Sequence, residues 1–414
     1  MSLSSFPRPE LPPHHPFSLE YTADPRPTFA RAHAEDAFLP IEEMNAVCVH
    51  GYDAVRAFCD HPLLSRNPAD AGLASPEALA ARAERWPMLE GSMTSVRREQ
   101  EKQSNLIREL LAPDFRPAMI RKMADTVQEV VQDVCAPLRH ESALDVVKLV
   151  QEVPLRVISR LLGIDETTRD ADLFLSCAPD YFRGLNPVSS DADRDKAEIA
   201  AGRMSAILAR AVEGRRADPR TDLVSQVIGI ADARGDVTAD ELVGALVILV
   251  AAGTDTTRLS TSLAVKTLLD HPEALALLRE DRGKLKNAVM ELLRYEGPTK
   301  FLVRAAVDDV EFEDKTVPKG SLVLLSIMGA GWDPRVFPAP EVFDVDRDLR
   351  GSLSFGFGSG YCLGVHLARL QVGTLVEYFL DHLPTTARVE RDGISWDPGN
   401  LMLREITSLP IRTR

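Results

Sequence analysis

The feature that most constrains the fold is a long helical stretch near the middle of the chain. It begins at Thr238-Ala-Asp-Glu241, where the threonine hydroxyl and the glutamate carboxylate are placed to satisfy N–H groups of the first turn. Helical patterning continues to His271-Pro272, where the proline ends it. At about 1.5 Å per residue the stretch is roughly 50 Å long, enough to cross a whole domain. We therefore expect one helix that runs through the core.

The most apolar part of this stretch, Leu242 to Gly253, is about a dozen residues and too short to span a bilayer, so it is predicted to be a buried core helix. Residues 1–25 form a proline-rich lead without an apolar segment, which predicts neither a signal peptide nor a membrane anchor. The formal net charge of −14 argues against nucleic acid as a partner. The five cysteines are scattered and form no C-x-x-C pair, the pattern of reduced thiols in a cytoplasmic protein.

The rest of the chain predicts a mainly α fold with a minor β region, in a single domain over 1–414. Aromatic residues are only 6% of the chain, which favours helix over sheet. Helical patterning covers about 98–269, and 67–91 is expected to be a long mobile connection. Helix breaks are expected at Pro113, Pro117, Pro137, Pro179, Pro187 and Pro219. Short strands are predicted within 38–50, 301–306, 310–317 and 321–327.

A glycine-rich segment from Phe355 to Gly364 places one cysteine, Cys362, where a loop meets a helix. A helix start offers unpaired N–H groups and a favourable dipole to a thiolate, and the glycines leave room for a flat macrocycle. Other interpretations compete with this one. A lone cysteine is usually a core residue. A glycine loop before a helix can cradle a phosphate, but the segment matches neither G-x-G-x-x-G nor G-x-x-x-x-G-K-[ST]. His366 lies four residues on and could activate Cys362 as a nucleophile, which the spacing alone does not reject.

The segment FGFGSGYCLGVHLAR, Phe355 to Arg369, resembles the signature around the haem-ligating cysteine of the cytochrome P450 family. The resemblance covers nearly the whole chain. It implies a single P450-like domain with the long helix over the haem, and it implies that Cys362 is the axial ligand of the iron in haem b. The further cofactor contacts that it implies are Arg108, Arg304, Ala252, Phe355, Gly356, Leu363, Gly364 and Ala368.

Within the long helix, Ala251-Ala-Gly-Thr-Asp-Thr-Thr257 interrupts the apolar run with hydroxyls and a carboxylate. A charge inside a core helix is costly unless it is paired or wet, and the glycine and threonines could open the helix locally to water. A solvent-facing kink is the plainer interpretation. The segment is similar to the family motif A-G-x-[DE]-T, which implies that Thr256 hydrogen-bonds dioxygen and that Asp255 helps relay protons.

Two further groups of residues are expected around the site. The resemblance implies a buried structural cluster of Glu291, Arg294 and Arg347 that holds the cysteine loop in place. The substrate pocket is expected to include Ala245, Ile248, Leu249, Phe301, Leu302, Leu401 and Met402, with Lys300 and Arg404 either solvated or anchoring an anionic group.

The chain also departs from the family pattern at two positions. A histidine is common where this chain has Ser104, and a basic residue or histidine is common where it has Gly360. The usual donors to the haem propionates on that side are therefore missing. Either Arg108 and Arg304 suffice together with water, or a residue that matches no family motif has taken over.

The leading hypothesis is a monomeric haem-thiolate monooxygenase that hydroxylates or epoxidises a small apolar organic molecule in secondary metabolism. Electrons are expected from a separate ferredoxin or flavodoxin and its reductase, steered by a basic cluster of Arg97, Arg98, Lys102, Arg108, Arg116, Arg121 and Lys122. An oxidative coupling or ring-forming enzyme of the same fold is the first alternative. A haem sensor or carrier without turnover and a Cys362/His366 thiol hydrolase are alternatives of other classes.

Overall fold

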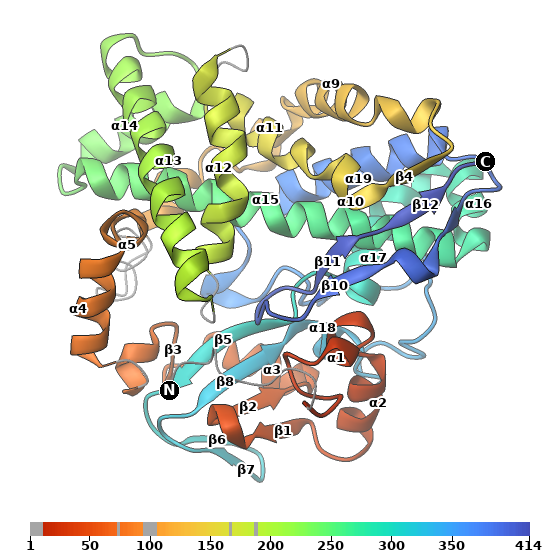
Figure 1. Ribbon diagram of the computed structural model, residues 1–414. Coiled ribbons are helices and arrows are strands. Elements are labelled where there is room, and N and C mark those ends of the chain that lie inside the picture. The colour runs from red at the N-terminus through yellow and green to blue at the C-terminus, as the bar shows by residue number, and fades with distance from the viewer. Residues whose placement is uncertain (1–10, 73–74, 94–105, 165–167, 186–188) are drawn as a thin grey trace.

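The computed structural model describes residues 11–72, 75–93, 106–164, 168–185 and 189–414 (Figure 1). Most of the described chain is helical, and a smaller β region lies at one side of the helices. The helices are α1 (Leu19–Ala23), α2 (Arg26–Ala34), α3 (Tyr52–Phe58), α4 (Pro76–Arg85), α5 (Pro87–Ser92), α7 (Leu106–Leu111), α8 (Pro117–Arg121), α9 (Ala124–Val134), α10 (Val146–Val150), α11 (Glu152–Leu161), α12 (Arg169–Leu185), α13 (Asp191–Ala217), α14 (Leu223–Arg234), α15 (Ala239–Asp270), α16 (Pro272–Glu280), α17 (Leu285–Glu296), α18 (Ile327–Gly331) and α19 (Val365–His382).

The strands are β1 (Phe38–Ile41), β2 (Ala46–Val49), β3 (Leu64–Ser65), β4 (Ala143–Asp145), β5 (Phe301–Ala306), β6 (Val310–Phe312), β7 (Lys315–Val317), β8 (Leu322–Ser326), β9 (Arg388–Val389), β10 (Ser395–Asp397), β11 (Glu405–Ser408) and β12 (Pro410–Arg412). Five of them form a sheet in the order β1-β2-β8-β5-β3, in which β2 and β8 are parallel. In this sheet β5 pairs antiparallel with β8, with Arg304 opposite Val323. The sheet therefore fixes which residues of β5 face the helices.

Helix α15 crosses the middle of the molecule, between α12 and α13 on one side and the β region on the other (Figure 1). The expected capping box is present: Thr238 Oγ1 accepts the Glu241 N–H at 3.2 Å, and the Thr238 N–H donates to Glu241 Oε2 at 2.8 Å. By length and composition α15 would suffice to cross a membrane, but 50% of its most apolar window is buried. Because it packs against α11, α13, α17 and α19, it is the central core helix of this fold.

Three local predictions are wrong. The segment 67–91 contains α4 and α5 rather than a continuous connection, because Ser75 caps α4 through the Ala78 N–H at 3.1 Å and Pro76 takes the first helical position. Pro179 does not end a helix but lies inside α12. Residues 310–317 form the hairpin β6–β7 instead of one strand. Pro187 lies outside the described residues.

Candidate active site

The cysteine loop closes on itself before α19 begins. The Cys362 N–H donates to the Phe355 carbonyl at 2.9 Å, and the Gly356 N–H donates to the Leu353 carbonyl at 2.7 Å. Gly356 and Gly358 have φ of 75° and 65°, in the left-handed region where glycine is favoured. The loop therefore holds Cys362 three residues ahead of the first residue of α19.

Cys362 lines a cavity of about 320 Å³ together with residues of α7, α11, α15 and α19. Burial raises the pKa of its thiol, whereas the Gly364 backbone N–H and the Arg108 charge oppose the rise. The hydrogen-bonding group that the structure places against the thiol is the Gly364 N–H and not the His366 imidazole, which gives no support to a thiol–imidazole pair. The cavity is lined by Arg66, Ile107, Arg108, Leu111, Phe115, Ile158, Ile248, Leu249, Ala252, Gly253, Thr256, Thr257, Ser359, Gly360, Tyr361, Cys362, Leu363, Gly364, Leu367, Ala368 and Gln371.

These walls fit a haem. The lining side chains are mostly apolar, while arginines lie at the loop residues 359–361, which suits an apolar macrocycle that carries two carboxylates. A Cβ atom at Gly364 would lie 4.0 Å from Cys362 Sγ, so the glycine leaves the sulfur accessible. Gln371 is 1% exposed, and its Oε1 has no hydrogen-bond partner among the described residues. The cavity thus offers a thiol, apolar walls and cationic groups to one bound cofactor.

Helix α15 carries its predicted residues on two different faces. Ile248, Leu249, Ala252 and Thr256 line the cavity of Cys362. Thr256 Oγ1 donates to the Ala252 carbonyl at 2.8 Å, as expected of a hydroxyl that bonds back along a helix. The expected local opening of the helix is not present, because α15 is continuous from 239 to 270 with its hydroxyls bonded to carbonyls four residues earlier.

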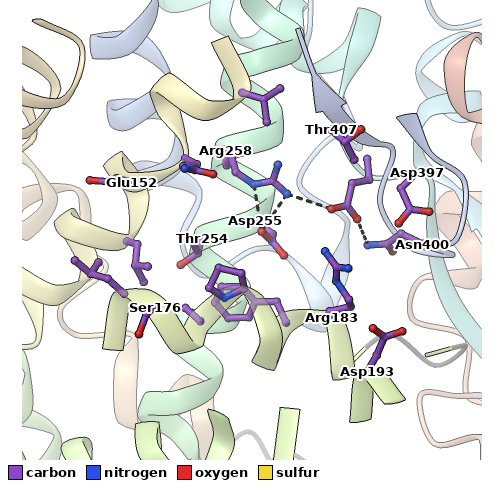
Figure 2. Close-up of a pocket in the computed structure, with 18 of the residues that line it drawn as sticks. Glu152, Ser176, Arg183, Asp193, Thr254, Asp255, Arg258, Asp397, Asn400 and Thr407 are labelled. Atoms are coloured by element: carbon purple, nitrogen blue, oxygen red, sulfur yellow. Dashed lines mark hydrogen bonds and ion pairs between the residues drawn. The ribbon is translucent and has the colours of Figure 1, made fainter. Parts of the chain in front are cut away.

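Asp255 faces a second, larger cavity of about 860 Å³ on the other side of α15 (Figure 2). Its carboxylate accepts from Arg258 Nη2 at 3.3 Å and Nε at 3.4 Å. Arg258 Nη2 also lies 3.5 Å from Glu405 Oε1 on β11, and Asn400 Nδ2 donates to Glu405 Oε2 at 3.2 Å. The charge of Asp255 inside this helix is therefore both paired and next to a cavity. The i, i+3 spacing of Asp255 and Arg258 was a signal that could have identified this partner.

The second cavity has polar walls on several elements. Arg183 and Asp193 project into it from α12 and α13, opposite Asp397 and Asn400 (Figure 2). Burial raises the pKa of Glu405, with the Arg258 charge opposing the rise. Helices α12 and α13 touch closely, because a Cβ atom at Gly184 would lie 2.1 Å from Ala197 Cβ. Glu152, Arg156, Asp397, Glu405 and Thr407 also line this cavity, and sequence reasoning had not identified them.

The two arginines expected at the haem carboxylates lie near the cysteine loop. Arg108 lines the cavity, and its Nη2 donates to the Ser359 carbonyl at 3.3 Å and to the Tyr361 carbonyl. Arg304 is 7% exposed and donates to the Val303 and Cys59 carbonyls at 2.9 Å and 3.2 Å. Ser104 lies outside the described residues. Arg66, which matched no motif, is a third arginine at the same place.

Glu291, Arg294 and Arg347 form a buried cluster. Arg294 donates to both Glu291 carboxylate oxygens, at 2.6 Å and 2.8 Å, and Arg347 Nε donates to Oε1 at 3.1 Å. Both arginines also donate to main-chain carbonyls of the segment that leads to the cysteine loop, namely those of Gly331, Pro338, Ala339, Pro340 and Val342. The hydrogen bonds of the cluster therefore fix the segment before the loop rather than the loop itself.

Several residues expected in the substrate pocket lie elsewhere. Phe301 is 1% exposed and stacks on Tyr21 with ring centroids 5.6 Å apart, and Leu401 packs in the same core region. Ala245 is fully buried among core side chains. Leu302 does approach the cysteine loop, since its Cδ1 lies 3.9 Å from the Cβ position of Gly356. Met402 is partly buried, and its carbonyl accepts the Lys300 N–H at 2.8 Å.

Phe355 and Gly356 do not line the cavity of Cys362, and Phe355 packs against the core instead. Lys300 and Arg404 are neither solvated nor facing a ligand. Lys300 Nζ donates to the Pro16 carbonyl at 2.9 Å, and Arg404 donates to Glu296 at 2.8 Å, both in buried positions. These two cations are therefore part of the structural core.

Comparisons with known proteins agree with this geometry. The family model for cytochrome P450 matches residues 90–392. The cytochrome P450 monooxygenase PikC of Streptomyces venezuelae is 33% identical over 411 residues, which cover 95% of this chain and 92% of the relative. The 6-deoxyerythronolide B hydroxylase of Saccharopolyspora erythraea is 32% identical over 312 residues, 74% of each chain.

Solved structures show the same fold. CalO2 superimposes with a TM-score of 0.85 at 27% identity, covering 97% of this chain and 98% of that one. The epothilone D-bound P450epoK superimposes with a TM-score of 0.82 at 26% identity, with the same coverage of both chains. These likenesses extend over nearly the whole length. The chain therefore belongs to the cytochrome P450 family of haem-dependent monooxygenases.

Proposed function

We propose that the protein binds haem b and inserts one atom of dioxygen into an organic substrate, with Cys362 as the thiolate ligand of the iron. The observation that carries the proposal is that Cys362 and Thr256 line one cavity, from the cysteine loop and from α15 respectively. When bound, the haem would supply the activation of dioxygen, and the Cys362 thiolate would favour cleavage of the O–O bond.

The chain's own residues would hold the cofactor and supply protons. Ile107, Leu111 and Phe115 line the cavity and exclude water from it. The Thr256 hydroxyl lies in that cavity, while Asp255 lies one residue away in the polar cavity. Because neighbouring residues of a helix do not face each other, a proton taken up at the Asp255 carboxylate would reach the Thr256 hydroxyl through a bridging group such as water. Arg108 and Arg304 would bind the haem propionates.

The substrate is proposed to be a secondary metabolite that places an apolar part beside Thr256. A relative named 6-deoxyerythronolide B hydroxylase and a solved structure with bound epothilone D support this class. The second cavity adds polar groups such as Arg183 and Asn400, so a remote part of the substrate can carry hydrogen-bonding groups. We propose that the protein works as a cytoplasmic monomer with a single catalytic domain, without nucleic acid or membrane partners.

Electrons are proposed to come from a separate ferredoxin or flavodoxin and its reductase. Arg116, Arg121 and Lys122 are exposed in or beside α8, which packs against α19, the helix that follows the cysteine loop. Arg97, Arg98 and Lys102 lie outside the described residues. A basic surface at this place would attract an acidic redox protein in an otherwise acidic chain.

Bond formation without oxygen insertion is the second candidate. One structural neighbour, CxnD, is named for C–S bond formation and superimposes with a TM-score of 0.80 at 27% identity. The two outcomes differ in product mass, since hydroxylation adds one oxygen atom and ring formation removes two hydrogens. Turnover of a converted substrate under labelled dioxygen separates them.

The experiment that tests the proposal is the spectrum of the dithionite-reduced, carbon-monoxide-bound protein. We expect a Soret band at the position characteristic of thiolate-ligated haem, and we expect Cys362→Ala to lose it. Cys135→Ala is the matched control, because Cys135 is a fully buried cysteine at the end of α9, outside the cavity. Retention of the band in Cys362→Ala would overturn the axial assignment.

A further inference from the structure

We propose that Arg66 binds a carboxylate of the haem in place of a side chain at position 360. The inference rests on the proposed haem-binding function, and it identifies a residue for the edge of the cofactor where this chain departs from the family pattern. Arg66 follows strand β3, far in sequence from the cysteine loop, and lines the cavity of Cys362.

The absence of a side chain at Gly360 makes room for the guanidinium of Arg66. A Cβ atom at Gly360 would lie 3.0 Å from Arg66 Nη2 and 3.7 Å from its Cζ. The same position lies 3.8 Å from Arg304 Nη2. The guanidinium groups of Arg66 and Arg304 therefore meet where a side chain at position 360, two residues before the cysteine, would project.

A short hydrogen-bonded chain holds Arg66 in this place. Arg66 Nη2 donates to Ser359 Oγ at 2.9 Å. Ser359 in turn donates to Asp60, from its hydroxyl at 2.5 Å and from its N–H at 2.9 Å. Gly358, with φ of 65°, makes room for this carboxylate, because a Cβ atom there would lie 2.0 Å from Asp60 Oδ2. The loop thus orients Arg66 through Ser359 and Asp60.

The electrostatics favour an anion at this edge. Burial lowers the pKa of Arg304, and the Arg66 charge lowers it further. Arg108 approaches the same loop residues through its contacts with Ser359 and Tyr361. Three guanidinium groups therefore converge on residues 359–361, and each can donate charge-assisted hydrogen bonds to a carboxylate. A cofactor with two carboxylates would offset their mutual repulsion.

The test measures haem release from the holoprotein to an excess of apomyoglobin. We expect Arg66→Ala to release haem about tenfold faster, the loss expected for one charge-assisted hydrogen bond. The thiolate-ligated carbon-monoxide band should keep its position, because Cys362 is unchanged. Arg203→Ala is the matched control, since Arg203 is an exposed arginine of α13 outside the cavity.

A position swap separates haem binding from a purely structural role. In the double variant with Arg66→Ala and Gly360→His, the imidazole would take the vacated space and restore slow release. Histidine at 360 does not rebuild the Arg66–Ser359 hydrogen bond, so a structural role of Arg66 would not be rescued.

The proposal is overturned if Arg66→Ala releases haem no faster than Arg203→Ala, or if the double variant releases it as fast as Arg66→Ala. Arg66→Lys serves where the alanine variant fails to fold, and it should show intermediate release because it keeps the charge but loses the guanidinium fork. A wild-type protein without the thiolate-ligated band would contradict the proposed function, whereas normal wild-type spectra with unaffected release contradict only the role of Arg66.

Discussion

The Arg258 guanidinium lies 3.5 Å from the Glu405 carboxylate and thereby links α15 to strand β11. The same guanidinium lies 3.3 Å from Asp255, so two carboxylates share one cation beside the polar cavity. The charge state of one carboxylate therefore affects how strongly the other is paired.

Glu405→Gln is expected to slow turnover. With Glu405 neutral, Arg258 pairs with Asp255 alone, so the Asp255 carboxylate is held more firmly and is less free to move toward Thr256. Asp255→Asn removes the proton carrier itself and should lower kcat more, by roughly 100-fold. Single-turnover rates with a bound substrate measure both effects. The hypothesis fails if the single-turnover rate of Glu405→Gln is lower than that of Asp255→Asn. It also fails if neither rate differs from that of Thr407→Val, a matched change in the same cavity wall.

Thr256→Ala is expected to divert electrons from product to hydrogen peroxide. Its hydroxyl lines the cavity of Cys362 from α15, and alanine removes this donor, leaving Thr257 as the neighbouring hydroxyl residue in that wall. The measurement is the ratio of peroxide to product for each electron pair consumed. Thr256→Ser keeps the hydroxyl and should stay near the wild-type ratio. Equal ratios for the alanine and serine variants would exclude the hydroxyl from proton delivery.

Glu291→Gln is expected to lower the free energy of unfolding by about 3–5 kcal/mol, because it leaves two arginines without their buried counter-charge. Glu291 and Arg294 side chains have 0% exposure, so solvent does not screen the loss. Chemical denaturation with far-UV circular dichroism measures the change. Glu341→Gln, an exposed change on the segment that the cluster fixes, should have little effect. A loss below about 1 kcal/mol, the range of surface pairs, would contradict the prediction.

Because the Lys300 amine is buried, we expect the free energy of unfolding of the protein to rise with pH. Burial lowers the pKa of this amine to about 7, with Asp397 and Glu405 opposing the change. Between about pH 7 and pH 10 the unfolded chain binds the extra proton, so the free energy of unfolding increases with pH, by at most about 1.4 kcal/mol per unit from this group.

Lys300→Met should remove this contribution. The measurement is urea denaturation at pH 7 and at pH 9. The free energy of unfolding should differ less between these two pH values in the variant than in the wild type. Lys286→Met is the control, since Lys286 is exposed and its loss leaves that difference unchanged. An equal pH dependence in wild type and Lys300→Met would show that burial does not lower the pKa of this amine.

Charge reversal at Arg116 and Arg121 is expected to weaken reduction by an acidic ferredoxin. Both side chains are exposed at the ends of α8, and steering by such charges is screened by salt. The rate of reduction should fall in Arg116→Glu/Arg121→Glu at low salt and approach wild type at high salt. Arg203→Glu on α13 is the control for a general charge effect. A wild-type rate independent of salt would contradict steering.

The sequence was most informative where local chemistry decides the structure. The capping box set the start of α15, and the bounds predicted for β5 agree with the structure. The start of α4 carried a usable signal as well, because Ser75 and Pro76 are a typical helix beginning. Its weak apolar periodicity concealed it, since α4 has no buried residue.

Tertiary packing decided the rest. Successive residues of a strand face opposite sides, so Leu302 and Arg304 reach the cysteine loop and Phe301 must turn into the core. The sequence alone assigned both Phe301 and Leu302 to the pocket, which one strand does not allow. Arg66 had no motif and no spacing signal, because only the fold brings it to Gly360. Pro179 stays helical because α12 packs along α13.

The close approach of Gly184 to Ala197 limits how this enzyme adapts to new substrates. With no room for even one more methyl group between them, α12 and α13 have to shift together when the polar cavity widens. Molecules of different length would thus be accommodated by a joint displacement of two helices, while the cysteine loop keeps its position. Directed evolution of specificity should accordingly accumulate changes at the outer edges of α12 and α13 and leave Gly184 and Ala197, where the two helices touch, unchanged.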